Sequence, residues 1–188
     1  MTQMFWRFGG EMLVLKQGDL TQAEVDAIVN AANPGLMGGG GIDGAIHKAA
    51  GPQLLEANKQ VVKEQGELAP GNAVMVPGFG LKAKHVIHTV GPVWRGGGQG
   101  EEEVLRAAYT NSLDLAAEKG LATIAFPAIS CGAYGYPEKM AAPVALEAMK
   151  QGVSQRKVQE AFLYVYSLSA FQTWSDLAKD ILGEPQIL

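Results

Sequence analysis

The sequence predicts an α/β fold in which a largely parallel sheet is covered by helices on both faces. Short apolar runs, most of them bounded by turn-forming residues, alternate along the chain with longer segments of helical spacing. Strands separated by helices need crossover connections, and such connections favour parallel pairing. The chain has 188 residues, of which 47% are hydrophobic, which is enough for one globular core. We expect a single domain over residues 1–188.

The expected strands are short, and several are almost continuously apolar. They cover residues 12–16, 25–30, 72–76, 84–90, 122–126 and 159–166. The expected helices cover residues 43–65, 101–119, 137–151 and 171–182. Gly120 is a good terminator for the second helix, whereas Pro143 leaves the start of the third undecided, because proline prefers a first turn. The segment 95–100, RGGGQG, is expected to be a mobile surface loop.

The charge pattern favours a nucleotide ligand over a nucleic acid. The formal net charge is −4, and acidic and basic residues are mixed along the whole chain. Because there is no run rich in lysine or arginine, a groove that follows a long phosphate backbone is not expected. A small phosphate ligand is still compatible, since backbone N–H groups at helix starts and in glycine loops bind a diphosphate without net positive charge.

Several other classes of protein are disfavoured. No stretch approaches the ~20 apolar residues that span a bilayer, and the first residues lack the layout of a secretion signal. Cys131 is the only cysteine, so a disulfide within the chain is excluded. The sequence contains no HExxH, no CxxC and no cluster of histidines with carboxylates, so neither a metal nor another cofactor is expected. We expect a cytoplasmic monomer without membrane association.

Polar or glycine-rich segments follow the expected strands, at the ends where ligands bind in open α/β sheets. The first contains Asp19, whose carboxylate could accept from an exocyclic amine; as a cap or turn residue it needs no ligand. The second contains Asn30 and Asn33, whose amides suit the vicinal hydroxyls of a sugar but are also common in turns before a residue such as Pro34.

Two glycine-rich segments, 38–47 and 128–137, suit a diphosphate. In the first, four consecutive glycines let the backbone approach a ligand and lead into a helix N-terminus that attracts anions. Asp43 could be the N-cap of that helix instead of a functional group. A Walker loop is excluded, because no Gly-Lys-Ser/Thr follows. The second segment would form another backbone cradle.

A cysteine nucleophile is a further alternative. Cys131 could act with His47, His85 or His88 as its base, but nothing in the sequence pairs the thiol with one of them. His85 and His88 alternate with apolar residues in an expected strand, which favours packing over catalysis.

Taken together, these segments resemble the macrodomain family, and within it the MacroD-type hydrolase branch. The matching stretches are GDL, VDAIVNAANPGLMGGGGIDGAIHKAAG, HVIHTVGP and FPAISCGAYGYP. They occur in the family's order and cover about residues 12–182, and the stretch from Val25 to Gly51 is highly specific. The resemblance implies a three-layer α/β/α domain with a mixed, largely parallel sheet that binds ADP-ribose across its strand ends.

The resemblance also implies roles for individual residues. Asp19 would accept from the adenine amino group with Leu20 beside it, and Tyr166 would stack on the adenine. The diphosphate would lie between two segments, formed by Ser130, Cys131, Gly132, Ala133 and Tyr134 on one side and by Gly40, Gly41 and Ile42 on the other. The distal ribose would meet Asn33, Asp43 and His47.

We therefore expect a metal-independent hydrolase that acts on acyl esters of ADP-ribose. Its substrates would be O-acetyl-ADP-ribose and proteins ADP-ribosylated on aspartate or glutamate, because both carry an ester on the distal ribose. Asp43 could orient or activate a water while Asn33 holds the ribose hydroxyls, and such positioning can supply much of the rate enhancement. The alternative from another class is a reader module that binds ADP-ribose without turnover.

Overall fold

A seven-stranded mixed sheet organises the described residues of this computed structural model, which are 2–186. The strands are β1 (Gln3–Phe8), β2 (Glu11–Gln17), β3 (Ala27–Ala31), β4 (Ala73–Pro77), β5 (His85–Thr89), β6 (Thr123–Phe126) and β7 (Glu160–Val165). Their order in the sheet is β1-β2-β7-β6-β3-β5-β4. The five central strands are parallel, whereas β1 and β4 pair antiparallel at the two edges. The expectation of a mixed, largely parallel sheet is confirmed.

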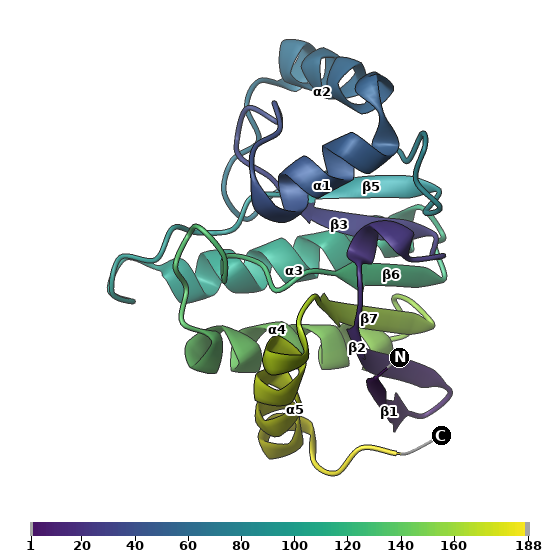
Figure 1. Cartoon of the computed structure of the whole chain (residues 1–188), viewed down its shortest axis with the longest axis vertical. Coiled ribbons are helices and arrows are strands. Elements are labelled where there is room, and N and C mark those ends of the chain that lie inside the picture. Colours follow the sequence, from purple (N-terminus) through teal and green to yellow (C-terminus); the bar gives the residue numbers. More distant parts are fainter. Residues whose placement is uncertain (1, 187–188) are drawn as a thin grey trace.

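Helices cover both faces of the sheet, as expected, and Figure 1 shows this layered arrangement. They are the short 3-10 helix η1 (Leu20–Gln22) and the α-helices α1 (Gly41–Ala50), α2 (Pro52–Gln65), α3 (Glu101–Glu118), α4 (Glu138–Ser154) and α5 (Leu168–Leu182). Successive residues of a strand point to opposite faces, so Val29 belongs to the core cluster that includes α3, α4 and α5, whereas Ile28 belongs to the cluster with Ile46 of α1 and Leu54 of α2. The fold is therefore the three-layer α/β/α arrangement.

Two elements differ from the sequence prediction. Strand β1 was not expected; it pairs antiparallel with β2 through a turn at Gly9 and Gly10, and its Phe5 also forms a bridge with Gln186. The expected helix 43–65 is two helices, because Gly51 adopts a φ of 86° and Pro52 starts α2. The expected domain over residues 1–188 includes Met1, Ile187 and Leu188, which lie outside the described residues.

The segment 95–100, expected to be mobile, is tied to the side chain of Glu101. The Glu101 carboxylate accepts hydrogen bonds from the backbone N–H groups of Gln99 at 2.8 Å, Arg95 at 2.9 Å and Gly97 at 3.1 Å. These donors, that of Gln99 foremost, lower the pKa of Glu101 to about 2. The carboxylate thus orders a glycine-rich loop that has no regular structure of its own.

Among the described helices, none combines the length and the apolar character needed to cross a membrane.

Candidate functional site

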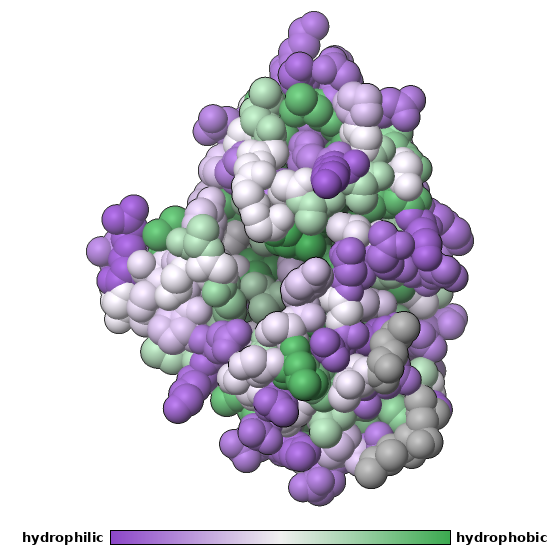
Figure 2. Space-filling view, viewed as in Figure 1, coloured by the Kyte–Doolittle hydropathy of each residue, from purple (hydrophilic) through white to green (hydrophobic). Residues whose placement is uncertain are grey.

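Four of the segments selected from the sequence follow adjacent parallel strands at one edge of the sheet. In sheet order, Asp19 follows β2, Tyr166 follows β7, residues 130–134 follow β6, and residues 33–43 follow β3. Neighbouring strands are about 4.8 Å apart, so this row extends over roughly 14 Å. Figure 2 shows a hollow near the middle of one face of the molecule, bordered by weakly polar and hydrophobic residues. Segments far apart in the sequence thus form one continuous edge that suits an elongated ligand.

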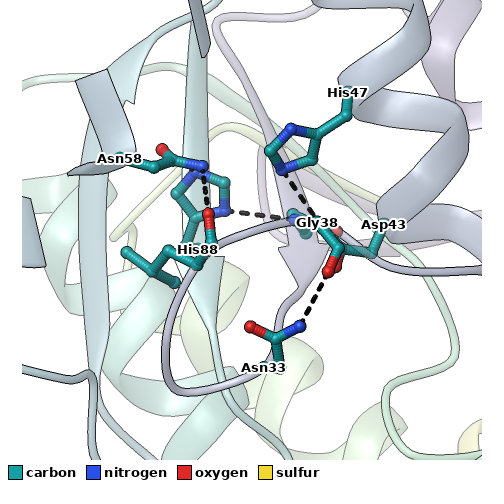
Figure 3. Close-up of polar contacts among 8 residues, drawn as sticks. Asn33, Gly38, Asp43, His47, Asn58 and His88 are labelled. Carbon is teal, nitrogen blue, oxygen red and sulfur yellow. Dashed lines mark hydrogen bonds and ion pairs between the residues drawn. The ribbon is translucent and has the colours of Figure 1, made fainter. Parts of the chain in front are cut away.

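Asp43 is not the N-cap of its helix. Gly40 occupies the cap position without a side-chain hydrogen bond, and Asp43 lies in the first turn of α1 with 6% of its surface exposed. Its Oδ1 accepts a hydrogen bond of 2.7 Å from Nδ2 of Asn30 and lies 3.5 Å from Nε2 of His47 (Figure 3). The carboxylate is therefore directed to the ends of the strands and not to its own backbone.

The structure brings Asn33 and Asp43 together around Gly39. Asn33 donates from Nδ2 to the carbonyl oxygen of Gly38 at 2.9 Å. A Cβ placed on Gly39 would lie 3.3 Å from Oδ2 of Asp43 and 3.9 Å from Nδ2 of Asn33. His47, one turn further along α1, packs its ring against Gly38, where a Cβ would lie 3.5 Å from it. The three side chains expected at the distal ribose thus surround the same stretch of loop, Gly38 and Gly39.

A buried row of hydrogen bonds continues from Asp43 into the protein. Nδ2 of Asn30 lies 3.1 Å from Nδ1 of His88, and Nε2 of His88 lies 2.9 Å from Oδ1 of Asn58. Asn58 then donates from Nδ2 to the carbonyl oxygen of Leu36 at 2.9 Å. Burial, followed by the nearby His47, lowers the pKa of His88 to about 3, so its ring is neutral at physiological pH.

Three buried polar side-chain atoms have no hydrogen-bond partner among the described residues, and all three belong to these segments. They are Oδ1 of Asn30, Nε2 of His47 and Oγ of Ser130. Buried polar atoms are nearly always paired in folded proteins. Their concentration at the end of β3, in α1 and in the segment after β6 therefore supports a site for a polar ligand.

Backbone donors line two of the segments. Within the described residues, the N–H groups of 38–41 and of 132–134 donate to no protein acceptor. Ser130 adopts a left-handed φ of 66°, and Gly91 approaches it so closely that a Cβ there would lie 2.2 Å from Oγ of Ser130. Free N–H groups at a helix start and in a tight loop bind anions, so the two segments suit the two sides of a diphosphate.

The glycines of these segments serve different purposes. A Cβ on Gly44 of α1 would lie only 2.5 Å from the carbonyl oxygen of Gly39, so glycine at position 44 allows the preceding loop to pass this close to the helix. A Cβ on Gly40 or Gly132 would meet no atom within 4 Å, and neither residue has a left-handed φ. Packing within the protein therefore does not explain why positions 40 and 132 are glycine.

At the other end of the row lie the three residues expected to contact adenine. Oδ1 of Asp19 accepts from N and Oγ1 of Thr21 at 2.9 and 2.7 Å, so Asp19 does cap a turn. Leu20 packs its side chain into the core, which leaves only its backbone for a ligand. Tyr166 is 81% exposed, and the hydrogen bond from Gly18 N to Val165 O joins the two segments.

The thiol of Cys131 does not suit nucleophilic catalysis. Burial, and next the negative charge of Glu138, raise its pKa to about 12, so the thiolate is scarce at neutral pH. His88 is engaged by asparagines through both ring nitrogens and is packed, as expected. No three His, Cys, Asp or Glu side chains in the described part of the chain are grouped to hold a metal ion.

Sequence reasoning singled out Asn30 only as a strand-end amide and missed Asn58 as a functional residue. Asn58 is fully buried on the inner side of α2 beside Leu54. A polar residue on the apolar face of a helix is the signal that could have identified it.

The structure is that of an α/β protein with unpaired backbone donors along one edge of its sheet, and the comparisons with known proteins name its family. The Macro domain family matches residues 29–145. The O-acetyl-ADP-ribose deacetylase of Citrobacter rodentium is 55% identical over 148 residues, which cover 79% of this chain and 84% of that protein. A deacetylase of the same name from Escherichia coli strain K12 is 52% identical over 149 residues, with coverage of 79% and 84%.

A solved structure agrees with these relatives. A variant of the Oceanobacillus iheyensis macrodomain with ADPR has a TM-score of 0.93 and 36% identity, and the match covers 97% of this chain and 100% of that one. The chain belongs to the macrodomain family. The named relatives are also consistent with the MacroD-type branch that the sequence indicated.

Proposed function

We propose that this protein binds ADP-ribose along the carboxyl edge of its sheet and removes the acetyl group from O-acetyl-ADP-ribose. The observation that carries the proposal is the pairing of Asn33 with the buried Asp43 around Gly39, at the end of a row of free backbone donors. Relatives more than half identical are named O-acetyl-ADP-ribose deacetylases, and a similar fold has been solved with ADPR.

We assign one part of the ligand to each position in the row of segments. Adenine lies beside Asp19 and the backbone of Leu20, with Tyr166 stacked on it. The diphosphate lies between Gly40, Gly41 and Ile42 on one side and Ser130, Cys131, Gly132, Ala133 and Tyr134 on the other. The distal ribose then reaches the loop that holds Asn33, Asp43 and His47. This assignment follows the spatial order β2, β7, β6 and β3.

Hydrolysis of this ester needs a water molecule oriented toward the acetyl group, and the ribose oxygen must be able to act as the leaving group. The water oxygen attacks the acetyl carbonyl carbon, and the bond between that carbon and the ribose oxygen then breaks. The products are acetate and a ribose hydroxyl, which takes up a proton derived from the water. Asp43 accepts a hydrogen bond from the water and orients it, while Asn33 holds the ribose hydroxyls. Such positioning and general-base help contribute about 10²–10⁴-fold or more.

The same bond occurs where ADP-ribose is esterified to an aspartate or glutamate side chain. The proposal therefore includes removal of single ADP-ribosyl groups from such proteins, in which the modified side chain takes the place of acetate. We also propose that the protein is a cytoplasmic monomer and that it acts as a single domain.

The test compares the wild-type protein with Asp43→Ala and Asn33→Ala on two substrates. Release of ADP-ribose from O-acetyl-ADP-ribose and from a glutamate-modified protein is measured by chromatography, and ADP-ribose affinity by calorimetry. We expect Asp43→Ala to abolish turnover while affinity changes by no more than about tenfold, which is about 1.4 kcal/mol. Asp114→Ala is the matched control, because Asp114 is a half-exposed surface residue of α3.

Two outcomes would change the proposal. Tight ADP-ribose binding without release from either substrate would make the protein a reader module. Turnover near the wild-type level in Asp43→Ala would remove Asp43 from the reaction, whatever the activity of the protein.

A further inference from the structure

We propose that His88 and Asn58 are positioning residues that fix, through one directional chain of hydrogen bonds, both the Asp43 carboxylate and the loop that carries Asn33. The inference rests on the proposed function, since it concerns the same reactive end of the site. Neither residue contacts the edge at which the ligand would lie: both are fully buried, His88 in β5 and Asn58 in α2.

The chain of hydrogen bonds joins five separate parts of the fold. It runs from Asp43 in α1 to Asn30 in β3, to His88 in β5, to Asn58 in α2, and ends on the carbonyl oxygen of Leu36 (Figure 3). Each link is between 2.7 and 3.1 Å long. Its two ends are thus the carboxylate and the 33–38 loop.

The direction of every link follows from the carboxylate. An ionised carboxylate can only accept, so the Asn30 amide must place Nδ2 toward Asp43. The second proton of the same Nδ2 points to Nδ1 of His88, which must then be an acceptor. A neutral His88 therefore carries its proton on Nε2 and donates to Oδ1 of Asn58. That leaves Nδ2 of Asn58 to donate to Leu36.

Only a neutral His88 satisfies this arrangement, and the surroundings keep it neutral. The titratable groups near its ring are His47 of α1 and, through Asn30, Asp43; β3 and α2 present asparagine side chains to it. Burial and His47 both lower its pKa. Protonation would place an N–H of His88 against an N–H of Asn30 and break the chain at its centre.

The chain therefore controls the relative position of the two candidate catalytic groups. Asn58 holds Leu36, which has an unusual left-handed φ of 53°, and the same loop carries Asn33. At the other end Asn30 orients Asp43. A displacement of about 1 Å at a reactive group can cost about 10²-fold in rate, so a buried residue that sets this geometry has a large effect on turnover.

The experiment combines a spectroscopic measurement with two variants. Nitrogen-15 NMR of the wild-type protein should show His88 as the neutral tautomer protonated on Nε2 from pH 5 to 8. His88→Leu should lower kcat about 10- to 100-fold, with KM and the Kd for ADP-ribose changed less than about threefold. His85→Gln, in the same strand but not in the chain, should keep wild-type kcat.

Asn58→Asp is the sharper variant, because it keeps the shape of the side chain. A carboxylate facing Nε2 favours the imidazolium form and raises the pKa of His88. Asn58→Asp also loses the donor to the carbonyl oxygen of Leu36, so we expect its kcat to be below the wild-type value at every pH. We expect kcat to fall further as the pH is lowered, in step with the titration of His88 seen by NMR. A residue with a merely structural role would lower kcat equally at all pH values.

The outcomes separate this inference from the proposed function. Wild-type kcat and pH profile in both variants, or a His88 ring protonated on Nδ1, would overturn the positioning role while leaving a deacetylase intact. If the wild-type protein has no turnover, the proposed function fails and the role in turnover with it, whereas the NMR result still decides whether the hydrogen-bond chain exists.

Discussion

The side-chain amide of Asn30 donates a hydrogen bond of 2.7 Å to Oδ1 of Asp43, although the two residues are 13 positions apart in different elements. The amide belongs to strand β3, near its end, and the carboxylate belongs to α1, the helix after the loop. This contact fixes the orientation of Asp43 before any ligand arrives, and preorganised groups of this kind are the most effective in catalysis.

Asn30→Asp should make turnover depend on pH in a new way. The substitution places a second carboxylate against Asp43, and two carboxylates in contact are not easily ionised together. We expect the rising limb of the plot of kcat against pH to move up by about one unit or more. Asn30→Ala, which adds no charge, should lower kcat without moving the limb. A wild-type profile in Asn30→Asp would show that the contact does not matter for the reaction.

Cys131→Ser should be nearly silent. Because burial and Glu138 raise the pKa of the Cys131 thiol to about 12, the residue is protonated at neutral pH. We expect kcat within about twofold of the wild-type value, and no inactivation by iodoacetamide at pH 7. Loss of activity in this variant would revive the cysteine mechanism.

Glu101→Gln should destabilise the protein and change how its stability depends on pH. The folded state lowers the pKa of Glu101 to about 2, chiefly through the N–H of Gln99. A lowered pKa stabilises the fold above the unfolded value of about 4.3, and this stabilisation is lost as the pH falls toward the folded value. Urea unfolding between pH 7 and pH 2 should therefore show a flatter acid limb in Glu101→Gln. An unchanged limb would mean that the carboxylate does not hold the loop.

Gly44→Ala should lower stability, while Gly40→Ala should not. The new Cβ at position 44 would lie 2.5 Å from the carbonyl oxygen of Gly39, whereas at position 40 it would meet nothing within 4 Å. Such overpacking costs about 1–3 kcal/mol. For a chain of this size that corresponds to a Tm lower by roughly 2–12 °C. Equal melting temperatures for the two variants would contradict the close approach of loop and helix.

The sequence was sufficient to predict the layers, the parallel centre of the sheet and the family, because these depend on local patterns. It also contained the signals for the two elements that were missed. Gly9 and Gly10, between two mainly apolar runs, are typical of a hairpin and mark β1, while Gly51-Pro52 marks the break between α1 and α2.

The hydrogen-bond chain behind the candidate site could not be predicted from the sequence. His88 and Asn58 are 30 positions apart, and the Asn58–Leu36 link connects residues 22 positions apart. Neither residue has a pattern around it that predicts its partner, since strand pairing and helix packing alone bring them together. For the same reason the sequence could not decide between a capping and a reactive Asp43, which depends on where the carboxylate points.

The protein itself has room for a side chain at Gly40 and at Gly132. No atom lies within 4 Å of a Cβ at either position, and neither residue has a backbone conformation that requires glycine. We infer that glycine is needed at these two positions because a bound ligand, and not the protein, occupies the space that a side chain would fill. Substitution of each glycine by alanine, serine and valine would therefore probe the space between the ligand and the backbone. The smallest side chain that weakens ADP-ribose binding or turnover, at unchanged Tm, would measure how closely the ligand approaches the backbone on each side.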